Sequence, residues 1–159
     1  MSEKSIADMP LYTNLDRIAR GLSAHGIGAK DAIPPETLFD LDQWHYHGTD
    51  AIRAAADQLR LGPGTRVLDV GSGVGGPARY LAYTVGCLVT ALELQPSLNA
   101  IAVDLTQRSG LSERITHILG DALTYPLSAP SLCATRTRAA FRRRVLHRGP
   151  LHARALRPR

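Results

Sequence analysis

Cysteines and long hydrophobic runs are scarce in this sequence. Only Cys87 and Cys133 occur among 159 residues, too few for a disulfide framework, and no further Cys/His cluster indicates a zinc site. No apolar run approaches the roughly 18 residues of a membrane helix. The first ten residues carry Glu3, Lys4 and Asp8 where a secretion signal has an apolar core. We therefore expect a cytoplasmic protein with no membrane partner and no structural metal.

Acidic residues are missing from the last part of the chain. Residues 131–159 hold nine arginines and no Asp or Glu, whereas residues 1–130 hold ten Lys/Arg and all fourteen Asp/Glu, net charges of +9 and −4. The overall charge of +5 therefore belongs to this Arg-rich tail, and no specific nucleic-acid partner is expected. Its composition favours a C-terminus altered by a frame shift or an alternative exon. One alternative is a nonspecific nucleic-acid arm, because closely spaced arginines neutralise phosphates. Another is a short helix over residues 134–146.

Alternation of apolar runs and amphipathic segments predicts an α/β fold. The length suits one domain, and 44 % hydrophobic residues suffice for a core. The expected strands span 67–70, 88–94 and 115–119, and the expected helices span 11–22, 50–59, 77–84 and 97–108. A proline-rich break is expected at 32–35. This order is typical of a doubly wound parallel sheet, and no fourth strand is expected after Asp121.

A glycine-rich turn lies between the first strand and its helix, in VLDVGSGVGGPARYLA at 67–82. Gly71, Gly73 and Gly76 satisfy G-x-G-x-x-G, where glycine permits a tight turn and close approach of a ligand to backbone amides. Glu93, twenty-two residues past Gly71, ends the second strand, where a carboxylate can accept ribose hydroxyls. These features fit a dinucleotide and S-adenosylmethionine alike.

Asp69 favours the second of these cofactors. It lies two residues before the first glycine, where its charge would repel a pyrophosphate but attract an ammonium and a sulfonium. Asp121, in GDAL after the third strand, can accept a hydrogen bond from an adenine amino group, with the Ala122 amide available for a ring nitrogen. Three carboxylates at three successive strand ends indicate an S-adenosylmethionine site.

Over roughly residues 43–127 the sequence resembles class I S-adenosylmethionine-dependent methyltransferases of the small-molecule branch. The sequence around the glycines is similar to that of the sarcosine/dimethylglycine, phosphoethanolamine and quinone/tocopherol methyltransferases. The resemblance implies the cofactor-binding half of a Rossmann-like sheet and methyl transfer to a small-molecule acceptor. The implied cofactor-binding residues are Asp69, Gly71, Ser72, Gly73, Gly76, Glu93, Leu94, Gln95, Asp121 and Ala122.

By the same resemblance the segment QWHYHG, residues 43–48, closes over the cofactor and faces the substrate. The implied lid and substrate residues are Gln43, Trp44, His45, Tyr46 and Gly48. His45, Tyr46 and His47 are candidates for catalytic proton transfer, although methyl transfer needs mainly alignment of its reactants. His25 and His117 are expected to be incidental.

Three regions are expected: an N-terminal helical cap and lid at 1–48, a cofactor-binding half at 49–130 and the Arg-rich tail at 131–159. Without a fourth strand the first strand would lie open at the sheet edge, so we expect self-association and impaired catalysis. Two alternatives remain open at this point. One is an NAD(P)-dependent oxidoreductase, and the other is a non-catalytic fragment that binds cofactor or nucleic acid.

Overall fold

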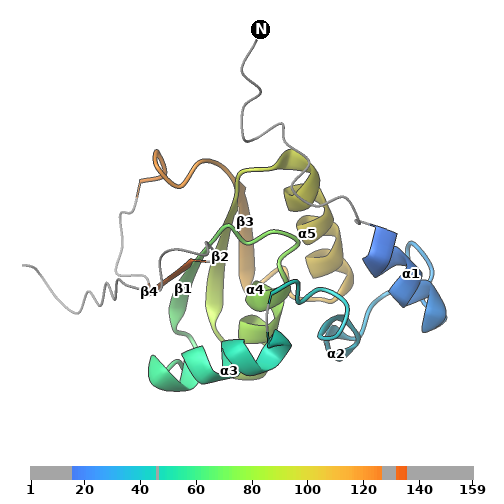
Figure 1. Cartoon of the computed structure of the whole chain (residues 1–159), viewed down its shortest axis with the longest axis horizontal. Coiled ribbons are helices and arrows are strands. Elements are labelled where there is room, and N and C mark those ends of the chain that lie inside the picture. Colours follow the sequence, from blue (N-terminus) through green and yellow to red (C-terminus); the bar gives the residue numbers. More distant parts are fainter. Residues whose placement is uncertain (1–15, 46, 127–131, 136–159) are drawn as a thin grey trace, which may run out of the picture.

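A parallel four-stranded sheet organises the molecule. The computed structural model describes residues 16–45, 47–126 and 132–135. The strands are β1 (Arg66–Val70), β2 (Leu88–Glu93), β3 (Ile115–Leu119) and β4 (Leu132–Thr135). They lie in the order β3-β2-β1-β4, and each neighbouring pair is parallel (Figure 1).

β4 contradicts the expectation that no strand follows the third. Val67 to Val70 pair with Leu132 to Thr135, so β1 lies between β2 and β4 and is not an open edge. Pairing uses backbone N–H and C=O groups, so four residues without a long apolar run are enough to extend a sheet beside β1. The expectation of an exposed β1 edge was therefore wrong, and with it the stated cause of self-association.

Three helical segments accompany the first three strands. They are α3 (Gly48–Gln58), α4 (Gly76–Tyr80), which continues into the π-helix η2 (Leu81–Val85), and α5 (Pro96–Arg108). Their bounds and those of β1 to β3 lie within two residues of the predicted ones, although the helix predicted at 77–84 ends in the wider π turn. Both crossovers move the chain in the same direction across the sheet, so right-handed connections place α4 and α5 on one face.

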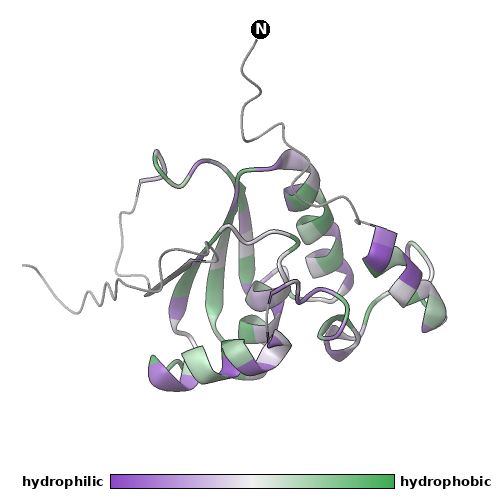
Figure 2. Cartoon of the chain, in the orientation of Figure 1, coloured by the Kyte–Doolittle hydropathy of each residue, from purple (hydrophilic) through white to green (hydrophobic). Residues whose placement is uncertain are grey.

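The main core lies between that face and the helices. Val67, Val89 and Ile115 are register partners on adjacent strands and pack with Ile52 and Ala56 of α3. Figure 2 shows the hydrophobic residues concentrated in β1 to β3 and in α5. Cys87 is fully buried in this core, where it packs as a small apolar residue, and burial raises the pKa of its thiol.

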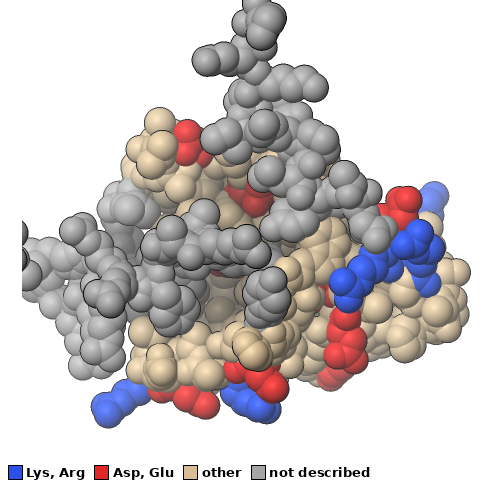
Figure 3. Space-filling view, in the orientation of Figure 1, with Lys and Arg blue, Asp and Glu red and all other residues tan. Residues whose placement is uncertain are grey.

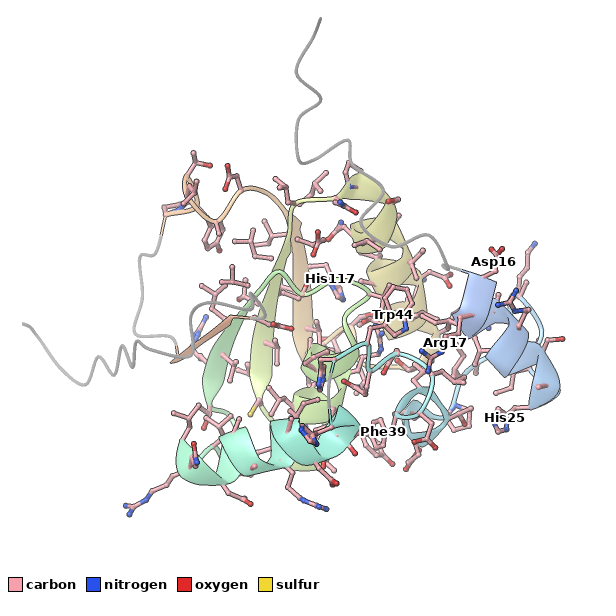
Figure 4. The ribbon with its side chains drawn as sticks, viewed as in Figure 1. Asp16, Arg17, His25, Phe39, Trp44 and His117 are labelled. Carbon is pink, nitrogen blue, oxygen red and sulfur yellow. The ribbon has the colours of Figure 1, made fainter. Side chains whose placement is uncertain are left out.

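The N-terminal cap contains α1 (Asp16–Ala24) and the short α2 (Pro35–Leu38). The prolines at 34 and 35 were expected only to break the chain, but Pro35 occupies a first helical turn, where its missing N–H is tolerated. The predicted start of the first helix, at 11–15, lies outside the described residues. Ile18 and Leu22 of α1 pack in one cluster with Val74 of the glycine-rich turn. Trp44, labelled in Figure 4, packs against that cluster.

Within the described residues no helix combines the length and apolar character needed to cross a membrane.

Candidate functional site

The glycine-rich turn leaves the end of β1 in a left-handed backbone conformation. Gly71, Gly73 and Gly75 have φ of 71°, 57° and 82°. The amides of Gly71 and Ser72 both donate to the Leu92 carbonyl, at 2.8 and 3.1 Å, and so fasten the turn to β2. A Cβ built on Gly71 would meet no atom within 4 Å. The turn is therefore held rigidly from one side and leaves open space at Gly71.

Glu93 joins this turn to the start of α5. Its buried carboxylate accepts hydrogen bonds from the Gly73 amide, at 2.7 Å, and from the Gln95 amide, at 2.9 Å. Each carboxylate oxygen retains a second acceptor position. Glu93 thus has a structural role that its sequence position did not reveal, and it keeps the capacity to accept further hydroxyl donors.

The other two acidic residues also lie toward the carboxyl edge of the sheet but differ in burial. Asp69 is buried in β1, next to Ala91 of β2 in register. The Gly120 amide donates to the Glu93 carbonyl at 2.9 Å, which brings the end of β3 beside the end of β2. Asp121 follows Gly120, is exposed, and accepts the Leu123 amide at 2.9 Å. The predicted convergence of three carboxylates on one sheet edge is present in the structure.

β4 makes β1 the point at which the strand order changes direction. The chain proceeds from β1 to β2 to β3 on one side, and β4 pairs on the other side. In open parallel sheets ligands bind outside the carboxyl ends of the strands at such a switch point. The glycine-rich turn begins directly after β1, so it lies at this point.

Gly76 has a contact that the motif alone did not predict. A Cβ at Gly76 would lie 2.5 Å from the Asp42 carbonyl oxygen, so the missing side chain lets the 42–45 segment pack on the start of α4. The structure thus supplies a packing reason for this glycine, and its assignment to the cofactor remains a prediction.

The predicted lid residues are partly packed into the cap. Gln43 is buried, and Trp44 and His45 are half-buried. The Trp44 indole donates to the Leu41 carbonyl at 3.1 Å. His47 is exposed, with Gly48 beginning α3 immediately after it, whereas Tyr46 lies outside the described residues. Of the two candidates for proton transfer that the structure describes, His45 and His47, His45 is the one whose ring contacts another side chain, with Nε2 3.0 Å from Gln43 Oε1.

The sequence did not reveal Arg79, which lies at the centre of a buried network. Its side chain and that of Asp42 are both 0 % exposed, and their closest contact is 2.9 Å. The five hydrogen bonds of the guanidinium go to Asp42 Oδ2 twice, the Val74 and Ala102 carbonyls and Thr106 Oγ1. All five N–H donors of Arg79 are therefore used. The only signal in the sequence was an arginine on an otherwise apolar helix, and nothing there identified a partner 37 residues away.

His117 belongs to the same network and is not incidental. Its Nε2 lies 2.9 Å from Thr106 Oγ1, and it lies between the strands and α5 (Figure 4). Burial, followed by the nearby charge of Arg79, lowers the pKa of His117 to about 4. The residue is therefore a neutral packing group at pH 7, whereas His25 is exposed, as an incidental residue would be.

Known structures share this fold. An S-adenosylmethionine-dependent methyltransferase from Thiobacillus denitrificans, in complex with S-adenosyl-L-homocysteine, matches with a TM-score of 0.52 and 25 % identity over 65 % of this chain and 44 % of that one. One from Geobacter sulfurreducens, in the same kind of complex, matches with a TM-score of 0.51 and 28 % identity over 65 % and 43 %. Fold and site together define the class as S-adenosylmethionine-dependent methyltransferases.

Within that class the family is protein-L-isoaspartate(D-aspartate) O-methyltransferase, whose model matches residues 47–135, and the chain belongs to it. This match covers the glycine-rich turn, Glu93 and β4. The glycine motif had left a dinucleotide and S-adenosylmethionine open as cofactors, and membership in a methyltransferase family favours S-adenosylmethionine. Among the described residues no group of three His, Cys, Asp or Glu side chains can hold a metal ion.

Curated relatives are similar over the same region. A glycine/sarcosine/dimethylglycine N-methyltransferase from Actinopolyspora halophila is 42 % identical over 64 residues, which cover 40 % of this chain and 11 % of that protein. A sarcosine/dimethylglycine N-methyltransferase from Halorhodospira halochloris is 38 % identical over 71 residues, 42 % of this chain and 25 % of that protein. The chain spans a quarter or less of the length of these two relatives.

Proposed function

We propose that this chain binds S-adenosylmethionine and forms the cofactor half of an enzyme that methylates a small-molecule acceptor. The observation that carries the proposal is the open space at Gly71, bounded by a turn that Leu92 and Glu93 hold in place. A turn that is held in place on one side and has open space on the other can bring its backbone amides close to a ligand.

The residues present fit this cofactor. Ser72 Oγ is buried and has no hydrogen-bond partner in the described part of the chain, so a polar group is needed beside Gly71. Gly71, Ser72 and Gly73 would hold the methionine part, while Glu93, with Leu94 and Gln95 behind it, would accept the ribose hydroxyls. Asp121 and Ala122 would bind adenine. The Asp69 carboxylate would favour the cation of the cofactor.

When bound, S-adenosylmethionine supplies an activated methyl group for an acceptor nitrogen, oxygen or carbon. The residues of this chain would orient the cofactor and exclude water, because alignment of the reactants provides most of the rate enhancement in such a reaction. The predicted lid, residues 43–48, would cover the site from the cap. The three-region division at 48 and 130 remains a prediction, with β4 joined to the sheet from the third region.

A small amine is the acceptor that the relatives favour. Both curated relatives described above carry sarcosine and dimethylglycine in their names, whereas the family description names an aspartate-derived carboxylate in a protein. We propose the small-molecule acceptor, a cytoplasmic location and no specific nucleic-acid partner. Assays with sarcosine, dimethylglycine, phosphoethanolamine and an isoaspartyl peptide would distinguish the two acceptor classes.

A pair of glycine variants tests the cofactor site. Gly71 and Gly110 both have positive φ, 71° and 68°, and a Cβ at either position meets no atom within 4 Å. Alanine at either position should therefore cost about 1 kcal/mol of stability through backbone strain alone. Only Gly71→Ala should also weaken S-adenosylhomocysteine binding, by about tenfold or more, because its methyl group occupies the space assigned to the ligand.

Calorimetric titration of the full chain and both variants with S-adenosylhomocysteine, S-adenosylmethionine and NADH provides the measurement. Equal affinities of Gly71→Ala and Gly110→Ala would contradict the assigned position of the ligand. Tighter binding of NADH than of S-adenosylmethionine would contradict the choice of cofactor.

A further inference from the structure

A chain of hydrogen bonds connects the buried ion pair to His45. It begins at Arg79, whose guanidinium contacts both the Val74 carbonyl of the glycine-rich turn and the Asp42 carboxylate. Asp42 Oδ1 accepts from Gln43 Nε2 at 2.9 Å, and Gln43 Oε1 lies 3.0 Å from His45 Nε2. Four side chains thus connect the interior of the cofactor half to the predicted lid.

The charge state at the buried end is determined by its surroundings. Arginine is always protonated in proteins, and a buried cation without a counterion is very unfavourable. Burial lowers the pKa of Arg79, and the neighbouring Asp42 opposes that effect. The Asp42 side chain is completely buried and receives two N–H groups of Arg79, so it is the ionised counterion. An ionised carboxylate can only accept hydrogen bonds.

This acceptor determines the direction of every later bond. Because Asp42 only accepts, the Gln43 amide must turn its NH₂ group toward Oδ1, which leaves its carbonyl oxygen toward His45. A carbonyl oxygen accepts and does not donate, so His45 Nε2 must carry the hydrogen. In that tautomer the ring lone pair is on Nδ1, and any proton that His45 takes up binds there.

We propose that Asp42, Gln43 and Arg79 are positioning residues that hold the neutral His45 ring in its Nε2–H tautomer and fasten the predicted lid to the glycine-rich turn. This inference deepens the proposed function, on which it rests for the role of the lid, because it identifies Nδ1 as the basic atom of the neutral His45 ring.

Variants that reverse the direction of these hydrogen bonds test the proposal. In Asp42→Asn the new amide must keep its oxygen toward Arg79 and present its NH₂ to Gln43. The Gln43 amide then turns over and donates to His45 Nε2, so the ring hydrogen should move to Nδ1. Gln43→Lys should also move the ring hydrogen of His45 to Nδ1, because an ammonium donates both to Asp42 and to His45 Nε2. This variant leaves the Arg79–Asp42 pair intact.

The readout is the nitrogen-15 spectrum of the full chain labelled in histidine, at a pH where His45 is neutral, since protonated and unprotonated ring nitrogens differ widely in chemical shift. The native chain should show His45 almost entirely as Nε2–H, and both variants mostly as Nδ1–H. Gln58→Lys, an exposed site on α3, is the matched control for the added charge and should leave His45 unchanged. The exposed His25 and His47 serve as internal references.

A mixture of tautomers in the native chain, like that of exposed His25, would overturn the proposal without any variant. So would retention of the Nε2–H form in either folded variant, with folding checked by the backbone amide spectrum. If Asp42→Asn does not fold, Gln43→Lys decides, because it keeps the ion pair. The tautomer is measured without cofactor, whereas the proposed function is tested by S-adenosylhomocysteine binding on the same sample, so either can fail alone.

Discussion

At the scale of single residues, the buried charged groups of Glu93 and Arg79 have hydrogen-bond partners within the protein. Glu93 receives two backbone amides, and Arg79 donates five hydrogen bonds. Removing either Asp42 or Arg79 would leave the other buried charge uncompensated, which costs about 3–5 kcal/mol of stability. Substitutions that change hydrogen-bond direction or proton uptake are therefore more informative than truncations.

His117 predicts a dependence of stability on pH. Its pKa is about 4 in the folded chain, below the ordinary value for histidine, so the unfolded chain binds more protons between about pH 4 and 6.5. Stability should be fully present above pH 6.5 and fall as the pH decreases toward 4. Because His117 is only half-buried, we expect a loss of about 1 kcal/mol between pH 7 and pH 5.

Chemical denaturation at the two pH values measures this loss. His117→Gln can still hydrogen-bond Thr106 but does not titrate, so its stability should change less over the same interval. An unchanged pH dependence in this variant would assign the effect to other groups.

At the scale of elements, the cap and the cofactor half are fitted together at the start of α4. The Asp42 backbone lies against Gly76, and Phe39 packs edge-on against Tyr80 with ring centroids 5.1 Å apart. Tyr83 of η2 also donates a hydrogen bond to Glu36 of α2. The glycine-rich motif therefore has two faces, one toward the predicted ligand and one toward the cap.

Gly76→Ala tests the face of the motif that packs against the cap. Its Cβ would lie 2.5 Å from a backbone oxygen, which cannot move out of the way as a side chain can, so we expect a loss of about 1–3 kcal/mol. Gly62→Ala is the matched control, because its Cβ meets no atom within 4 Å and Gly62 does not have positive φ. It should be neutral or slightly stabilising. Thermal melts of both variants measure the difference, and equal melting temperatures would contradict the close approach of Asp42.

At the scale of the whole molecule, β4 changes what the end of the chain is expected to do. It supplies the second neighbour of β1 and creates the change in strand order at the candidate site. The residues that follow it, 136–159, contain all nine arginines of the Arg-rich tail and lie outside the described residues.

Two truncations test the contribution of β4. A chain ending at 135 keeps the strand, whereas a chain ending at 131 loses it and leaves β1 with β2 as its one partner in the described sheet. We expect the shorter chain to melt about 5–10 °C lower and to self-associate on sizing chromatography, because an unpaired strand edge pairs readily with another chain. Identical behaviour of the two truncations would show that the β1–β4 pairing contributes little.

The chain ending at 135 also tests for nucleic-acid binding. Residues 1–135 carry ten Lys/Arg and fourteen Asp/Glu, a net charge of −4, which repels phosphate. In Figure 3 the charged side chains along the lower edge, over α3, are of mixed sign. Any DNA affinity of the full chain should fall to background in this truncation and decrease with salt in the full chain. Salt-dependent titrations measure it, and DNA binding that survives the truncation would contradict the assignment.

The sequence by itself determined the alternation of β1, α4, β2, α5 and β3 and the convergence of Asp69, Glu93 and Asp121 on one sheet edge. These follow from local periodicity and from the rule that parallel strands end on the same side. Only the tertiary structure decided the pairing of β4, the partners of Arg79 and the packing of Asp42 on Gly76. Those depend on backbone hydrogen bonds and side-chain contacts between residues far apart in the chain, which leave no periodic pattern in the sequence.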